Sequence, residues 1–132
     1  MPGIFKVDNI EFTNAVVDEP ERSFQILDGK NAGRLQGNLR MERDVRGTFY
    51  NYKMNIDSEF MTQEEYSTLY NLLSAPVNSH ILEVPFNQET LTFEAYITSG
   101  VDKVTRIDED GNHWTGLSIN FVAMEPQRRP SE

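Results

Sequence analysis

Apolar and polar residues alternate along most of this chain, which is the pattern of half-buried β-strands. The clearest example covers residues 50–57, where Tyr, Tyr, Met and Ile stand at every second position. Similar alternation predicts further strands at 4–12, 23–27, 82–86, 91–97, 101–107 and 114–123. The acidic, Gly-containing segment 108–112 predicts a hairpin loop between the last two of them.

One segment has helical spacing instead. Thr62 is followed three positions later by Glu65, which is the pattern of a capping box at a helix start. An apolar stripe at i, i+3, i+4 and i+7 follows, formed by Tyr66, Leu69, Tyr70 and Leu73. Because the residue before a proline disfavours helical geometry, Pro76 ends the helix near residue 75. These signals predict a helix at about 62–75.

The elements together predict a mainly β (α+β) protein, an antiparallel β-sandwich or barrel of seven to eight strands with one flanking helix. With 132 residues and no internal repeat or linker, we expect one domain over 1–132. We expect an exposed arm at about 14–22, where Pro20 breaks an acidic run, and a flexible tail at about 126–132. The arginine-rich segment at about 34–46 predicts a strand pair or a long extended ribbon.

Composition narrows the classes of function. The chain has no cysteine, which excludes disulfides and thiolate zinc sites. It shows neither a long apolar run nor a basic-then-apolar start, so we expect no membrane span, no signal peptide and synthesis in the cytoplasm. A net charge of −9 argues against a broad basic face for nucleic acid, although an acidic surface can line a passage through which DNA slides.

Candidate catalytic or metal-binding chemistry is weak. His80 and His113 each begin a predicted strand without a partner at ligand spacing, so we expect both at the surface or at a sheet rim. Segment 108–112 resembles the start of a calcium loop, but Ile119 stands where the last ligand belongs and turn chemistry explains the same residues. We therefore predict no catalytic residues, no cofactor and no metal site, and hence no enzyme.

Several segments resemble small structural proteins encoded in tailed phages and prophages of Gram-positive bacteria. They are 24–29 (FQILDG), Arg34, 43–44 (RD), 47–52 (GTFYNY), 73–77 (LSAPV), 114–121 (WTGLSINF) and 124–130 (MEPQRRP). The resemblance implies a β-sandwich with one helix beside it, and a subunit that forms rings, usually hexamers. Such a ring belongs to a tail tube, a tail-completion layer or a baseplate or distal tail, around a passage for DNA.

The resemblance also implies partners and contacts. The partners are further copies of this chain and other tail proteins, with DNA only as a non-specific passenger and no membrane. The location is the virion tail, after synthesis in the host bacterium. The expected subunit contacts are the arm at about 14–22, the arginine-rich segment at about 34–46 and the C-terminal segment at about 126–132. The contact residues there are Asp18, Glu19, Glu21, Arg34, Arg40, Arg43, Arg46, Arg128 and Arg129. Opposite charges there would give steering and register.

Two other classes stay open. One is a monomeric module that recognises a peptide or a host protein through a sheet edge. The other is an enzyme that uses a barrel lumen. Self-association separates the ring subunit from both, because strand edges covered by neighbours in a ring are exposed in a monomer.

Overall fold

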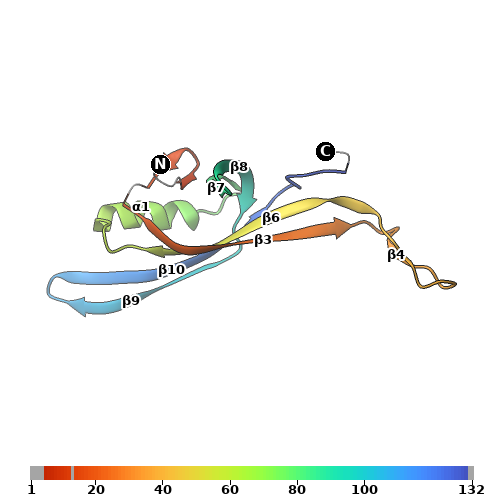
Figure 1. The fold of residues 1–132 in the computed structure, drawn as a ribbon. Coiled ribbons are helices and arrows are strands. Elements are labelled where there is room, and N and C mark those ends of the chain that lie inside the picture. Colours follow the sequence, from red (N-terminus) through yellow and green to blue (C-terminus); the bar gives the residue numbers. More distant parts are fainter. Residues whose placement is uncertain (1–4, 13, 131–132) are drawn as a thin grey trace.

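The computed structural model describes residues 5–12 and 14–130. These residues contain ten antiparallel strands and one helix (Figure 1). The elements are β1 (Lys6–Val7), β2 (Ile10–Glu11), β3 (Val16–Asp28), β4 (Gly33–Arg34), β5 (Met41–Glu42), β6 (Val45–Asp57), α1 (Gln63–Leu73), β7 (His80–Phe86), β8 (Glu89–Tyr96), β9 (Gly100–Asp108) and β10 (Gly111–Ala123). The predicted mainly β, antiparallel fold with one flanking helix is confirmed.

Eight strands form one sheet in the order β2-β1-β7-β8-β10-β6-β3, with β9 added beside β10, while β4 and β5 pair with each other. Because the path ends at β2 on one side and β3 on the other, the sheet is not closed into a barrel. Strand β10 joins β2-β1-β7-β8 on one side to β6 and β3 on the other. Its middle pairs with β6, its first half with β9, and its last two residues with β8.

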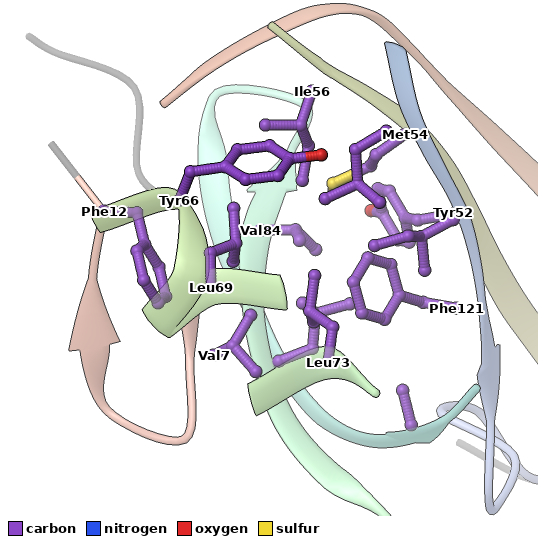
Figure 2. Packing of buried hydrophobic residues seen from close by; sticks show 14 residues of the cluster. Val7, Phe12, Tyr52, Met54, Ile56, Tyr66, Leu69, Leu73, Val84 and Phe121 are labelled. Carbon is purple, nitrogen blue, oxygen red and sulfur yellow. The ribbon is translucent and has the colours of Figure 1, made fainter. Parts of the chain in front are cut away.

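The core lies between α1 and the sheet. Figure 2 shows Leu69 and Leu73 of α1 in the same buried cluster as Met54 and Phe121 of the sheet. Burying each such side chain contributes on the order of 1.5–3 kcal/mol. The sequence stripe is correct for Tyr66, Leu69 and Leu73, but Tyr70 is 41% exposed and is not part of the core. An i, i+4 neighbour of a core residue need not face the same partner when the stripe is narrow.

The start of α1 is as predicted. Thr62 is the N-cap, its hydroxyl accepts from the Glu65 backbone N–H, and the Glu65 carboxylate accepts from the Thr62 N–H. This reciprocal pairing satisfies two backbone donors that a helix start otherwise leaves without partners. Capping fixes the first turn of α1, and with it the position of Tyr66.

The prediction of one strand at 4–12 was wrong. Strands β1 and β2 form a very short hairpin, and Asp8 and Asn9 between them have positive φ values of 51° and 69°. Asp and Asn tolerate this left-handed conformation, so the pair makes a tight turn. Residue 4 lies outside the described residues.

The acidic segment at 14–22 is not a loop, which corrects the prediction of an arm there. From Val16 onward it is the first part of β3 and pairs with β6. The register shifts between Asp18 and Glu21, and Glu19 has a φ of 44°, so the strand contains a bulge around Pro20. Proline is tolerated in an edge strand at a bulge, because no ladder hydrogen bond needs its missing N–H. The side chains of Asp18, Glu19 and Glu21 are exposed, as expected.

The structure confirms one of the two forms predicted for 34–46, and it corrects the flexible C-terminal segment expected from residue 126 onward. The first is a strand pair, β4 with β5, which form a short hairpin at the tip of the longer β3–β6 ribbon. The second is tied down: the Thr48 N–H donates to the Arg128 carbonyl, and the Gln127 side chain donates to and accepts from the Tyr50 backbone. Gly47 permits this, since an added Cβ there would lie 2.5 Å from Pro126 Cβ. Residues 131–132 of the predicted tail lie outside the described residues.

Candidate functional site

The β3–β6 ribbon carries apolar side chains that no part of the described chain covers. Its two strands have thirteen residues each, and their distal halves extend away from the core toward the β4–β5 tip (Figure 1). On β3, Phe24 is 68% exposed and Ile26 46% exposed, and Leu27 is also exposed. Such a patch on a strand typically marks an interaction surface.

Two long strands also have an unpaired edge. Within residues 5–12 and 14–130, β3 pairs only with β6, and β9 pairs only with β10. These strands are the two sides of one four-stranded layer, β9-β10-β6-β3. The backbone N–H and C=O groups along such edges are a template for another strand. Val101 and Ile107 on β9 add exposed apolar side chains to the second edge.

The arginines predicted as contacts fall into two groups. Arg43 Nε lies 2.8 Å from Asp28 Oδ1, and Arg46 Nη2 lies 3.0 Å from Asp44 Oδ2, so both belong to ion pairs at the base of the tip. The hydrogen bond from Arg43 lowers the pKa of Asp28 below its usual range. These two arginines therefore hold the tip hairpin together within one chain.

The remaining predicted contacts lie in separate places. Arg34 and Arg40 are exposed in the tip itself, and Arg128 and Arg129 are exposed beside β6. The acidic group of β3 lies at the opposite end of that strand from the tip. Within one chain, therefore, the acidic residues of β3 do not meet the arginines of the tip, whereas the C-terminal segment is bonded to β6 of the β3–β6 ribbon.

A groove between α1 and the β9–β10 hairpin was not predicted. It encloses a cavity of about 630 Å³, within the usual range of ligand pockets. Tyr66 and Trp114 line it together with Met61, and Asp57 and Glu59 add carboxylates. A smaller hollow of about 210 Å³ continues along the helix and is lined by Tyr66, Ser67, Tyr70, Asn71, Asp102 and Trp114. The two hollows share an aromatic wall.

Tyr66 fixes the position of β9 relative to the helix. Its hydroxyl donates to Asp102 Oδ2 at 2.6 Å. Burial, together with that hydrogen bond and the charge of Asp102, raises the pKa of Tyr66 well above its usual range. The tyrosine therefore stays a protonated donor to a carboxylate at the groove.

The histidines differ from each other. The rim position predicted for His80 was wrong, because its side chain is only 5% exposed and its Nδ1 lies 2.7 Å from Asp8 Oδ2. Burial opposes the charge of Asp8, but hydrogen bonds from His80 and from the Ile81 N–H outweigh it, so the pKa of Asp8 is lowered. The Asp8 turn thus lies beside the start of β7 and places a polar partner next to the buried ring. His113 is partly exposed and lies 3.1 Å from Asp108 in the β9–β10 hairpin.

Comparison with known proteins adds no identity: no family model matches the chain, and no curated protein matches it. Among residues 5–12 and 14–130, no group of three or more His, Cys, Asp or Glu side chains is placed to hold a metal ion. Over the same residues, no helix is long and apolar enough to cross a membrane.

Proposed function

We propose that this chain is a non-enzymatic virion structural protein, a ring-forming subunit of a phage tail in the tube, a tail-completion layer or the baseplate or distal tail. The observation that carries the proposal is the four-stranded layer β9-β10-β6-β3, which ends on both sides in a long strand with an unpaired edge among the described residues. Exposed apolar side chains follow both edges.

Two different edges favour a head-to-tail assembly. When β3 of one copy pairs beside β9 of the next, the contact joins unlike surfaces, and repeated unlike contacts close into a ring if the rotation between copies permits it. Backbone pairing satisfies the edge donors and acceptors, and Phe24 and Ile26 leave water. A ring built in this way joins the layers of its subunits into one continuous sheet.

The charge of the chain agrees with a passage for DNA. The net charge is −9, and Asp18, Glu19 and Glu21 are exposed on β3. A surface with this charge repels the phosphate backbone, because tight binding needs Lys and Arg to release counterions. DNA would therefore move past such a wall without being held.

The mass of the purified chain in solution tests the proposal. It is to be measured by analytical ultracentrifugation over a range of concentrations, alone and with the other tail proteins of the same phage, and the particles viewed by electron microscopy. We expect closed oligomers, with a central opening, to appear with rising concentration or on addition of tail partners. A strict monomer under all these conditions contradicts the proposal.

The second candidate is a monomeric module that binds a peptide or a host protein through a sheet edge. The groove beside α1 favours it, since a cavity of about 630 Å³ with an aromatic wall adjoins the edge strand β9 through β10. In this case the chain stays monomeric and protects β9 from hydrogen exchange only when a foreign protein is bound.

A further inference from the structure

We infer that the groove between α1 and the β9–β10 hairpin receives the β4–β5 tip of a second copy of this chain. The tip is the turn formed by residues 35–40 together with Arg34. The inference rests on the proposed self-assembly and names one of its contacts. It differs from the contact expected from sequence, in which the basic segment met the acidic residues of β3.

The tip presents apolar side chains to water. Leu39 is 69% exposed and Leu35 is 44% exposed. Leu39 has a φ of 61°, a left-handed conformation that is uncommon for a leucine and costs free energy. A strained, exposed leucine at the end of a hairpin contributes nothing to the core of its own chain, whereas it fits a socket on another molecule.

Hydrogen bonds fix the shape of the tip. The Leu39 N–H donates to the Leu35 carbonyl at 3.0 Å, and the Arg34 guanidinium donates to the Leu39 carbonyl at 3.2 Å. Asn38 accepts from the Arg40 N–H at 2.9 Å. A tip that is ordered before binding loses less conformational entropy when it docks.

The groove has the matching chemistry. Its wall of Tyr66, Met61 and Trp114 provides apolar surface for leucine side chains. Asp57 and Glu59 line the same cavity, Asp102 lines the adjoining hollow, and neither hollow is lined by Lys or Arg among the described residues.

The cations of the tip are available for these carboxylates. Arg34 has no carboxylate partner among residues 5–12 and 14–130. Arg40 has only Glu42, at 3.8 Å and with both side chains mostly exposed. Two leucines flanked by two arginines therefore complement an aromatic socket with acidic residues.

The contact must join two molecules. The tip and the groove lie at opposite ends of the elongated fold (Figure 1), so one chain cannot insert its own tip. A turn of six residues is also much smaller than the roughly 20–30 residues per side of a stable interface. The tip therefore acts together with strand-edge pairing and sets which subunits meet and in which register.

Cysteine cross-linking tests the contact without interference from native thiols, because the chain has no cysteine of its own. Leu39→Cys places a thiol on the tip, and Ser67→Cys places one in the groove, where Ser67 lines both hollows. The two single variants are mixed under assembly conditions and oxidised mildly. We expect a covalent dimer of 39 with 67 on a denaturing gel, in a much higher yield than from either variant alone.

Thr92→Cys is the matched control for Ser67→Cys, since Thr92 is exposed on β8 and lines neither hollow. The pair of Leu39→Cys with Thr92→Cys should give at most background dimer. Equal yields from both pairs, or no dimer from the 39–67 pair, overturn the inference. If the protein still forms closed oligomers in that case, the ring proposal stands. If it is monomeric throughout, both fail.

Charge reversal tests the expected charge pairing through the same cross-link. Arg40→Glu should lower the 39–67 cross-link yield several-fold, because repulsion replaces an ion pair at the rim of the groove. Arg34 is kept in this variant, since its guanidinium holds the Leu39 carbonyl and thereby the shape of the tip. Adding Asp57→Lys and Glu59→Lys to the Ser67→Cys variant, which supplies the groove, should restore the cross-link yield with the reversed tip. Circular dichroism checks that each variant is folded. An unchanged yield with the reversed tip, or no recovery with the reversed groove, contradicts the charge pairing.

Discussion

The Tyr66 hydroxyl links the core to the groove. Its ring lies in the buried cluster with the helix stripe, and its oxygen reaches Asp102 on the edge strand β9. The ring of Tyr70, one turn further along α1, is stacked beside it with 6.5 Å between the ring centroids. Both tyrosines line the smaller hollow, but of the two only Tyr66 also belongs to the buried core.

Replacing Tyr66 by Phe should lower the free energy of unfolding by about 1 kcal/mol at pH 7, because the variant loses one hydrogen bond to a charged acceptor that stays partly hydrated. Tyr70→Phe is the matched control and should change little, since Tyr70 is exposed. Urea titrations followed by circular dichroism measure both. Equal stability of the two variants would contradict the role of the Tyr66 hydrogen bond.

The same hydroxyl predicts an alkaline effect. The pKa of Tyr66 is raised in the folded state, whereas a tyrosine in the unfolded chain titrates near 10. The stabilisation is therefore fully present below about pH 10 and is lost as the pH rises further, because the unfolded state then releases a proton that the folded state keeps. The difference in free energy of unfolding between the wild type and Tyr66→Phe should be smaller at pH 11 than at pH 9, as measured by urea unfolding curves. The same difference at both pH values would refute this.

Among the elements, α1 and β3 illustrate opposite outcomes of local signals. The capping box of α1 is formed by residues three positions apart, so neighbours in the sequence decide it. The bulge of β3 around Pro20 appears in the pairing of that strand with β6, so residues distant in the sequence take part in it. The helix start can thus be tested by single substitutions within its own turn.

Thr62→Ala should lower the free energy of unfolding by about 1 kcal/mol, the usual cost of losing a helix N-cap. Thr68→Ala in the same helix is the matched control. Its hydroxyl bonds only to the Glu64 carbonyl one turn back, and alanine is the better helix former, so we expect no loss. Thermal unfolding of the two variants compares them directly. A loss at Thr68 as large as that at Thr62 would rule out capping as the cause.

At the scale of the whole molecule, two pairs of strands leave the core in opposite directions, the β3–β6 ribbon and the β9–β10 hairpin, and they set the shape (Figure 1). The parts of their outer strands that lie away from the core place apolar side chains in water. A monomer gains no stability from this arrangement, whereas an assembly gains both backbone pairing and apolar burial.

Ile26→Lys should abolish or strongly reduce oligomers and change the free energy of unfolding by no more than about 0.5 kcal/mol, as expected for an exposed position. Ile81→Lys is the matched control, because Ile81 is 48% exposed against 46% for Ile26 but lies on β7, between β1 and β8 in the sheet. Sedimentation velocity of the two variants compares their assembly. Oligomers of normal size with Ile26→Lys would exclude the β3 edge as a contact.

The candidate site was only partly predictable from the sequence. The charged residues predicted as contacts lie on the β3–β6 ribbon, at its tip and in the adjoining C-terminal segment, and all of them are exposed, because charged side chains are rarely buried. The sequence does not show which arginines form ion pairs within the chain. Only the fold places Asp28 and Asp44 beside Arg43 and Arg46. The groove gave no local signal, since Trp114 and Tyr70 both fit an apolar stripe.

The sequence by itself determined the elements that depend on neighbours along the chain: the capped helix, the alternation of buried and exposed residues in β6 and β10, and a hairpin turn within residues 108–112. The tertiary structure decided which strands pair, that Pro20 belongs to a strand, that residues 126–128 pack on β6, and that His80 is buried against Asp8. Periodicity states which face of an element is apolar. Only long-range packing selects the partner of that face, and with it the edges and grooves that stay open.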